Sequence, residues 1–338
     1  MVSSDGKIAV VGSGSWGTAL ANALSHKGLK VTIWSRRSML AESIQQKHEN
    51  SEYLPGVFLS PRLRATADLE AAIEGAEVIV MAVPAQGFRD TLRAVARFAE
   101  ADAPIVSLAK GLEAETLCRM SEVIAQEIPA SWPKRICALS GPNLAKEIAL
   151  GHPAASVIAC ADTEIADELQ ALFMTPVFRT YSDSDVVGVE LGGAIKNVIA
   201  IATGISEGCG FGDNARATVM TRGLAEMTRL GVSLGADRRT FAGLAGVGDL
   251  ICTCISGLSR NHHVGVELGR GAAMDSILKG MKEIAEGVES SKAVKEIAER
   301  QGIDMPICQG VYRVIHENQE ISEMVADLLR TVRQRERD

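Results

Sequence analysis

The stretch Lys7-Ile-Ala-Val-Val-Gly-Ser-Gly-Ser-Trp-Gly17 decides the fold of this 338-residue chain. Its first five residues form an apolar run typical of a buried strand, and the pattern of Trp16–Lys27 predicts a helix. Gly12 permits the tight turn between them, Gly14 lets the backbone approach a pyrophosphate, and Gly17 allows the helix to pack against the strand. The helix N-terminus offers free N–H groups and a positive dipole end to phosphates. The stretch therefore predicts a dinucleotide-binding site.

The remainder of the first half alternates short apolar runs with amphipathic segments. The apolar runs are nearly continuous, as expected for strands that are buried on both faces. Amphipathic patterns such as Gln86–Phe98 and Thr163–Leu172 predict helices between them. This alternation predicts an α/β fold with a doubly wound parallel sheet. The further strands are expected at Lys30–Trp34, Val78–Val83, Ile105–Leu108, Ile136–Leu139, Ala155–Ala159 and Val177–Thr180.

The strand pattern stops near Asp185, and helical patterns follow to the end of the chain. A glycine-rich stretch, Leu244 to Gly257, interrupts them. We therefore expect two domains, residues 1–184 with the dinucleotide site and an all-helical domain at residues 185–338 that carries the substrate site. The expected helices are Val186–Ser206, Asn214–Leu230, Ser291–Arg300, Gly310–Glu317 and Ile321–Arg330.

Composition limits the classes of partner and the compartment. A net charge of -7 disfavours nucleic acid or an anionic membrane as the main partner. The amino terminus does not look like a signal peptide, and we find no apolar run near the roughly 20 residues of a membrane helix. Integral membrane association is therefore not expected, and the cytoplasm is the expected compartment.

The seven cysteines show no spacing typical of a disulfide framework. Cys252 and Cys254, followed by His262 and His263, could suggest zinc. Their spacing fits no ordinary zinc finger or ribbon, so we favour free thiols and expect no metal.

The end of the second strand bears on cofactor choice. A site for NAD usually has an acidic residue there, which accepts a hydrogen bond from the ribose 2′-hydroxyl. This chain has Arg36 and Arg37 instead, after Trp34 and Ser35. A basic pair suits a 2′-phosphate, so NADP is favoured over NAD. The alternative is that both arginines are solvated surface charges.

Two segments in the first half could contact a ligand. Lys110, in Leu108-Ala-Lys-Gly111, comes just after the carboxyl end of an expected strand, where open α/β sheets bind ligands. It could donate to a ligand oxygen, or it could be an exposed loop lysine. Asn143, in Ser140-Gly-Pro-Asn-Leu-Ala-Lys-Glu147, could either cap the following helix or belong to a ligand-binding turn.

Lys196 is the candidate catalytic residue. It lies within the apolar, small-residue segment Glu190–Ala200. Burial lowers the pKa of a lysine, as a general acid and base near neutral pH requires. The alternative is a lysine that extends to the edge of its domain. Asp249 is a plausible partner for the ammonium, and Arg260 with Asn261 suits a phosphate.

These segments, in this order, resemble the bacterial NAD(P)-dependent glycerol-3-phosphate dehydrogenase family. The resemblance runs from Lys7 to about Arg330. It implies an amino-terminal Rossmann domain, a helical carboxyl-terminal domain and a homodimer. It also implies hydride transfer between NAD(P)H and dihydroxyacetone phosphate, giving sn-glycerol 3-phosphate for phospholipid synthesis. The motifs are the glycine loop, Ala109-Lys-Gly111, Ser140-Gly-Pro-Asn143, Gly193-Ala-Ile-Lys-Asn197, Gly248-Asp-Leu250 and Ser259-Arg-Asn261.

The resemblance also implies roles for single residues. Lys196 matches the proton donor and acceptor. Substrate contacts are implied for Lys110, Gly141, Asn143, Lys196, Asp249, Ser259, Arg260 and Asn261. Cofactor contacts are implied for Gly12, Gly14, Ser15, Trp16, Gly17, Arg36, Arg37, Lys110, Ala145, Arg260, Ile284 and Glu286. Two features depart from the family pattern: position 143 often carries Ser or Thr, and the loop Cys254–Ser259 varies in length.

Two other functions are alternatives. A β-hydroxyacid or ketopantoate-type reductase would share the two-domain plan and the lysine, but its substrate carries a carboxylate. A nicotinamide-sensing regulatory protein would bind the cofactor without chemistry. Such a protein has no reason to hold Lys196, Asp249 and Arg260 together.

Overall fold

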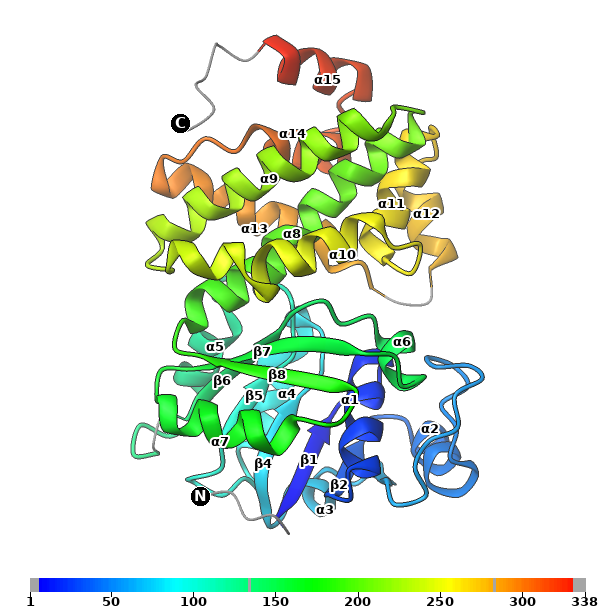
Figure 1. Ribbon diagram of the computed structural model, residues 1–338, viewed down its shortest axis with the longest axis vertical. Helices are drawn as coiled ribbons and strands as arrows, with labels where there is room; N and C mark the ends of the chain where they lie inside the picture. The colour runs from blue at the N-terminus through cyan, green and yellow to red at the C-terminus, as the bar shows by residue number, and fades with distance from the viewer. Residues whose placement is uncertain (1–5, 133–134, 282–283, 331–338) are drawn as a thin grey trace.

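A computed structural model describes residues 6–132, 135–281 and 284–330. Its first part is an eight-stranded sheet with helices on both faces, and its second part is helical (Figure 1). The strands are β1 (Lys7–Val11), β2 (Lys30–Trp34), β3 (Arg64–Thr66), β4 (Ala76–Met81), β5 (Ile105–Ser107), β6 (Ile136–Ser140), β7 (Ala154–Cys160) and β8 (Phe178–Asp183). The helices of this sheet region are α1 (Ser15–His26), α2 (Ser38–Glu42), α3 (Leu69–Ile73), α4 (Phe88–Val95), α5 (Met120–Glu127), α6 (Ala145–Ala149) and α7 (Thr163–Phe173).

The sheet has the order β3-β2-β1-β4-β5-β6-β7-β8, so the chain winds outward in both directions from β1 and β4. Strands β1 to β6 are parallel, which confirms the predicted doubly wound arrangement. Strand β3 was not predicted, because its three residues are polar or small and only partly buried.

One pair departs from the expected parallel sheet: β7 runs antiparallel to β6. The connection between them contains only α6, which has five residues. A helix that short rises about 7.5 Å, too little to return along β6 for a parallel crossover. The next connection contains the 11-residue α7, and β8 is accordingly parallel to β7.

Both faces of the sheet are covered. Ile8 and Val10 of β1 pack in one apolar cluster with Leu20 of α1. Ala9 and Val11, which alternate with them, pack in a second cluster with residues of α4. The alternation of side chains along a strand therefore supplies two cores, which explains the nearly continuous apolar runs.

The glycine loop has the geometry that its motif predicts. Gly12 has a φ of 117°, and a Cβ on Gly17 would lie 2.3 Å from the Gly12 carbonyl oxygen. Gly14 precedes α1, and a Cβ there would meet nothing within 4 Å. The helix N-terminus is thus open to a ligand.

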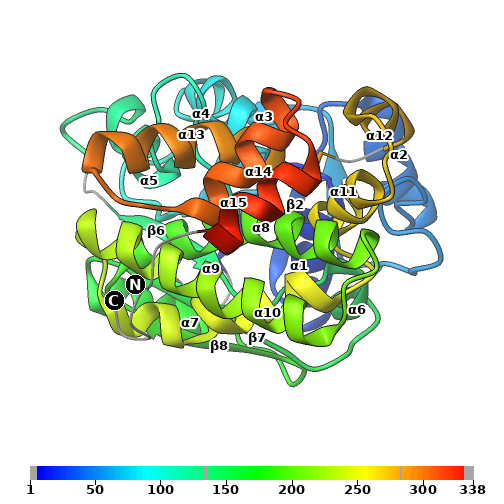
Figure 2. The same cartoon turned by 90° about the horizontal axis from the view of Figure 1, so that it is seen from above.

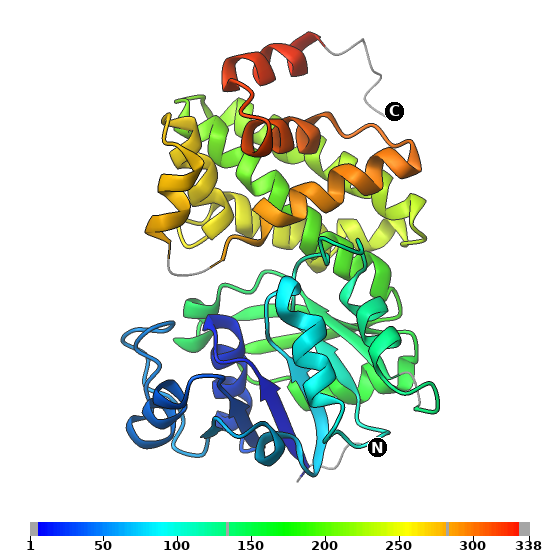
Figure 3. The same ribbon diagram turned by 180° about the vertical axis from the view of Figure 1, so that it is seen from behind.

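The helical region surrounds one central helix, α8 (Val186–Gly208). Helices α9, α10, α11 and α13 pack against α8, and Figure 2 shows them around α8 from above. Figure 3 shows the helical region stacked on the sheet region. The sequence analysis missed three short helices, α10 to α12, which have 7, 10 and 7 residues and glycines within or next to them. The other helices of this region are α9 (Asp213–Ser233), α10 (Asp249–Ile255), α11 (Arg260–Gly269), α12 (Met274–Gly280), α13 (Glu286–Gln301), α14 (Pro306–His316) and α15 (Ile321–Arg330).

The expectation that no apolar run approaches membrane length was wrong for α8. This helix has 23 residues and a window of mean hydropathy 1.5, enough to cross a membrane by length and composition. However, 94% of that window is buried inside the fold. Its apolar side chains therefore form the core of the helical region.

Candidate active site

Lys196 lies on the side of α8 that faces α10, and its side chain is 5% exposed. Its Nζ donates a hydrogen bond to Oδ1 of Asp249, the first residue of α10. It also donates to the hydroxyl of Thr253 at 2.7 Å. The alternative of a lysine that extends to the domain edge is therefore wrong, because this ammonium is enclosed and paired.

A second ammonium approaches the same carboxylate from the sheet region. Lys110 follows β5, and its Nζ lies 2.8 Å from Oδ2 of Asp249 and 2.7 Å from the carbonyl oxygen of Gly141. Its side chain is 14% exposed, so Lys110 is not an exposed loop lysine. Asp249 thus bridges two lysines that come from different parts of the chain.

The local charges explain the titration of the cluster. Burial lowers the pKa of Lys196 to about 8, with Asp249 opposing this change and Lys110 adding to it. Burial alone would raise the pKa of the Asp249 carboxyl, but Lys110 and then Lys196 outweigh it and hold the pKa below its ordinary value. The cluster therefore holds a lysine that exchanges protons near neutral pH, which suits a general acid and base.

A chain of amide hydrogen bonds connects this cluster to the start of α13. The side chain of Asn197 donates to the carbonyl oxygen of Lys110 at 2.9 Å. Asn261 donates to Asn197 at 2.9 Å, and its own oxygen accepts from the backbone N–H of Gly287. The backbone of the Lys110 loop is thereby attached to the helical region.

The expected phosphate-binding residues lie at the N-terminus of α11. Ser259 caps this helix, since its hydroxyl accepts from the backbone N–H of His262 at 3.2 Å. Arg260 is exposed, and one of its guanidinium nitrogens donates to the carbonyl oxygen of Ile284 at 2.7 Å. A helix N-terminus beside an arginine suits an anionic ligand.

Asn143 does not cap α6, so that alternative was wrong. The helix begins after Leu144 and has no side-chain cap. The Asn143 oxygen instead accepts from the hydroxyl of Ser156 at 2.6 Å. Its amide nitrogen is buried without a hydrogen-bond partner among the described residues. Because buried polar groups are usually satisfied, this N–H is a candidate donor to a ligand.

The expected cofactor residues at the end of β2 divide into two environments. Arg37 pairs with Glu52 at 2.8 Å and lies over the ring of Tyr53. Arg36 is exposed, and no ion pair of Arg36 occurs in the part of the chain that the structure describes. Arg37 is therefore partly used inside the fold, and Arg36 is the freer of the two.

The other expected cofactor residues occupy three places. Ser15, in the glycine loop, donates to the carbonyl oxygen of Tyr53 at 3.0 Å. Trp16 packs edge-on against Phe178. Ala145 is the first residue of α6, and Ile284 is 54% exposed. Glu286 is the first residue of α13, and its carboxylate accepts from the backbone N–H of Ala85 at 3.3 Å.

Thr253 was missed by the sequence analysis although a signal was present. It stands four residues after Asp249, on the same face of α10. Its hydroxyl donates to the Asp249 carbonyl oxygen at 2.7 Å, which directs its lone pairs toward Lys196.

The cysteine and histidine pattern does not gather into a metal site. Cys254 accepts from the hydroxyl of Thr203, and His262 lies 3.3 Å from Glu207. Within residues 6–132, 135–281 and 284–330, no group of three or more metal-ligating side chains is present.

Comparison with known protein families supports a single assignment. The amino-terminal model of NAD-dependent glycerol-3-phosphate dehydrogenase matches residues 7–166, and the carboxyl-terminal model matches residues 185–326. A protein of Thermobifida fusca named glycerol-3-phosphate dehydrogenase (NAD(P)+) is 51% identical over 313 residues, which cover 92% of both chains.

The structural comparisons agree with this assignment. The crystal structure of glycerol-3-phosphate dehydrogenase from Coxiella burnetii is 36% identical, with a TM-score of 0.91, and covers 97% of this chain and 100% of that one. A ketopantoate reductase from Ralstonia eutropha is 15% identical, with a TM-score of 0.58 over 92% of this chain and 97% of that one. The second likeness shows a shared fold alone.

Proposed function

The chain belongs to the NAD-dependent glycerol-3-phosphate dehydrogenase family, and we propose that Lys196 is the general acid and base of its reaction. The chain is an NAD(P)-dependent oxidoreductase that interconverts dihydroxyacetone phosphate and sn-glycerol 3-phosphate. The observation that carries the proposal is the buried ammonium of Lys196, held by Asp249 and Thr253 with a pKa near 8.

In the proposed mechanism, the bound nicotinamide supplies or accepts the hydride at the central carbon of the triose. During reduction, Lys196 gives a proton to the oxygen that becomes the hydroxyl, and its charge stabilises the developing alkoxide. In the reverse direction, neutral Lys196 removes that proton. Asp249 and Thr253 hold the nitrogen in place through both steps.

We propose that the substrate lies among the charged and amide groups around this lysine. On the sheet side, the Lys110 ammonium donates to the carbonyl oxygen of Gly141. The buried amide N–H of Asn143, two residues farther along the chain, has no hydrogen-bond partner among the described residues. The N-terminus of α11, with Ser259, Arg260 and Asn261, suits the phosphate. The positive charge there supports a dianionic group in preference to a neutral one.

We propose that the cofactor lies along the glycine loop, Gly12, Gly14 and Gly17, with Ser15 and Trp16 beside it. Ala145, Ile284 and Glu286 are further proposed contacts. The free guanidinium of Arg36 supports a preference for NADPH over NADH, because it suits a 2′-phosphate. Arg37 contributes less to this preference, since Glu52 already neutralises it.

Four further parts of the proposal concern organisation and setting. We propose a dinucleotide-binding domain at residues 1–184, a helical substrate domain at residues 185–338, and a homodimer; the outermost residues of both ranges lie outside the described part of the chain. The cytoplasm suits the seven free thiols. Supply of sn-glycerol 3-phosphate to phospholipid synthesis is the proposed role.

The test compares the wild type with Lys196→Met, which removes the ammonium and keeps much of the side-chain volume. NADPH oxidation with dihydroxyacetone phosphate should be nearly lost in the variant while NADPH binding and thermal stability persist. A folded variant with wild-type turnover would refute the role of Lys196. Rapid turnover of a 2-keto acid by the wild type, without turnover of the triose phosphate, would favour a ketopantoate-type reductase.

A further inference from the structure

The loop that carries Lys110, residues 108–119, lies between the sheet region and the helical region. Its Leu112 is buried in the core of the helical region, and the Lys110 carbonyl oxygen accepts from Asn197 on α8. On its other side, the loop contacts α4 and the short turn Ala85–Gly87 before it. The position of the Lys110 ammonium therefore depends on what holds this loop.

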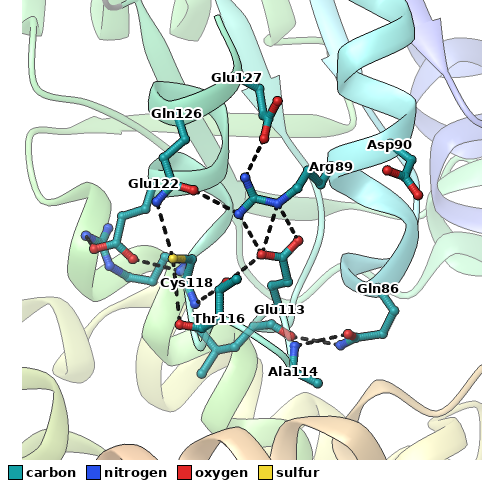
Figure 4. Close-up of polar contacts among 12 residues, drawn as sticks. Gln86, Arg89, Asp90, Glu113, Ala114, Thr116, Cys118, Glu122, Gln126 and Glu127 are labelled. Atoms are coloured by element: carbon teal, nitrogen blue, oxygen red, sulfur yellow. Dashed lines mark hydrogen bonds and ion pairs between the residues drawn. The ribbon is translucent and has the colours of Figure 1, made fainter.

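Gln86 holds the first half of the loop by its side-chain amide. Its nitrogen donates to the carbonyl oxygen of Leu112 at 2.9 Å. Its oxygen accepts from the backbone N–H of Ala114 at 3.0 Å (Figure 4). One side chain thus satisfies two backbone groups on either side of Glu113, as a neighbouring strand would.

Arg89, the second residue of α4, holds the loop through Glu113. The guanidinium makes a bidentate pair, with Nε 2.9 Å from Oε1 and Nη2 2.6 Å from Oε2. Both side chains are largely buried, at 16% and 12% exposure. Arg89 also bonds Glu127 and Gln126 of α5, as Figure 4 shows, through guanidinium contacts separate from the bidentate pair with Glu113.

Glu113 also closes the second half of the loop. Its backbone N–H donates to the carbonyl oxygen of Cys118, and its carbonyl oxygen accepts from the N–H of Leu117. Its carboxylate accepts from the hydroxyl of Thr116 at 2.5 Å. Leu117 has a φ of 65°, which residues other than glycine rarely adopt, so these contacts hold a strained turn.

We propose that Gln86, through the backbone on either side of Glu113, and Arg89, through the Glu113 carboxylate, are positioning residues that place the Lys110 ammonium against Asp249. The proposal rests on the proposed roles of Lys110 and Lys196. Two ammonium groups share one carboxylate, so Lys110 is repelled by Lys196 while Asp249 attracts it. Because the Lys196 charge opposes part of this attraction, the contacts to Asp249 and Gly141 hold Lys110 less firmly, and a free loop would let the ammonium leave this position. The clamp on its backbone prevents that.

The test compares Glu113→Gln and Gln86→Leu with Glu127→Gln. Glu127 is the matched control, because it pairs with the same Arg89 in a similarly buried place but does not hold the loop. The two loop variants should lower kcat/KM for dihydroxyacetone phosphate about 10- to 100-fold, as expected for a misplacement near 1 Å. They should also move the decline of the reduction rate to higher pH, because the Lys110 charge lowers the pKa of Lys196.

The control should keep the wild-type kcat/KM and pH dependence at a similar loss of thermal stability. In a background of Lys110→Met, Glu113→Gln should cause little further loss, since both changes act through one ammonium. If the loop variants match the Glu127 control while Lys110→Met loses activity, the positioning role is overturned and the role of Lys110 stands. If Lys110→Met itself is silent, the proposed role of Lys110 fails.

Discussion

Replacing Asp249 by asparagine removes the one charge that holds two lysines together. The amide has nearly the shape of the carboxylate, so packing around the 2%-exposed side chain should change little. The hydrogen bonds to Lys196 and Lys110 lose their ionic partner. Both ammonium groups then face each other without compensation. We expect this variant to hold a smaller share of Lys196 in the protonated form at neutral pH.

The size of the effect follows from the pKa of Lys196. At a pKa of about 8, the lysine is about 90% protonated at pH 7. Loss of an opposite charge in contact lowers the pKa by about 1 to 3. The protonated share at pH 7 then falls to between about 50% and about 1%. Reduction should therefore slow by about 2- to 100-fold at pH 7 from protonation alone.

The assay is the initial rate of NADPH oxidation with dihydroxyacetone phosphate across a pH series, together with the reverse reaction. In the wild type, the rate of reduction should decline above a pH of about 8, and the rate of oxidation should rise toward it, because the two directions need opposite forms of Lys196. In Asp249→Asn, the decline should begin at lower pH. Acidification should therefore recover much of the lost reduction rate.

A matched control is Asp90→Asn, which removes a carboxylate whose side chain is 88% exposed. It should leave both pH profiles unchanged. Thermal unfolding of each variant separates loss of fold from loss of function. If Asp249→Asn is folded, slow at every pH and unshifted in its decline, the carboxylate does not act through the protonation of Lys196, and the electrostatic reasoning is wrong.

Three further outcomes follow from the structure. Arg36→Ala should raise the KM for NADPH more than the KM for NADH, while Arg37→Ala should change the ratio of these two KM values less. If steady-state kinetics show the same change of this ratio in both variants, the assignment of the 2′-phosphate site is wrong. Burial raises the pKa of Glu226 from the ordinary 4.5 to about 7. Protonated Glu226 therefore stabilises the fold fully below pH 4.5, and this stabilisation is lost as the pH rises through 7. The free energy of unfolding should fall by about 3 kcal/mol over that range. Glu226→Gln should remove this dependence from urea unfolding at pH 5 and pH 8, and an unchanged difference would refute it. In Gly265→Ala, the new Cβ would lie 2.1 Å from a backbone oxygen of α8, so the free energy of unfolding should fall by about 3 kcal/mol in thermal unfolding. Gly257→Ala is the control, because a Cβ at position 257 has open space and should change the stability little.

The parts of the fold that the sequence predicted are those with a local signal. The glycine loop between β1 and α1 is one continuous segment, and two of its glycines, Gly12 and Gly17, answer a local steric need. Lys196 was recognisable because a charged residue in an apolar helix requires a partner. Asp249 was predicted as a plausible partner, and the structure places its carboxylate on that ammonium.

The parts that could not be predicted depend on tertiary contacts. The antiparallel direction of β7 follows from the length of α6, and a five-residue helix has almost no periodic pattern. Arg37 looked equivalent to Arg36 until the fold brought Glu52 beside it. Arg89 pairs with Glu113 and Glu127, which lie 24 and 38 positions farther along the chain. The sequence around these residues resembles that of ordinary surface charges and does not indicate the pairing.

The charge of the site indicates how substrate and proton donor act on each other. Lys110, Lys196 and Asp249 together carry one excess positive charge in a largely buried place, which burial penalises. A phosphate dianion beside them offsets that charge and favours the protonated form of Lys196. In the proposed mechanism, binding of the phosphorylated ketone would therefore favour the acid form of Lys196 that reduction needs. A dephosphorylated ketone should lose turnover as well as affinity, since it provides neither the positioning nor the compensating charge.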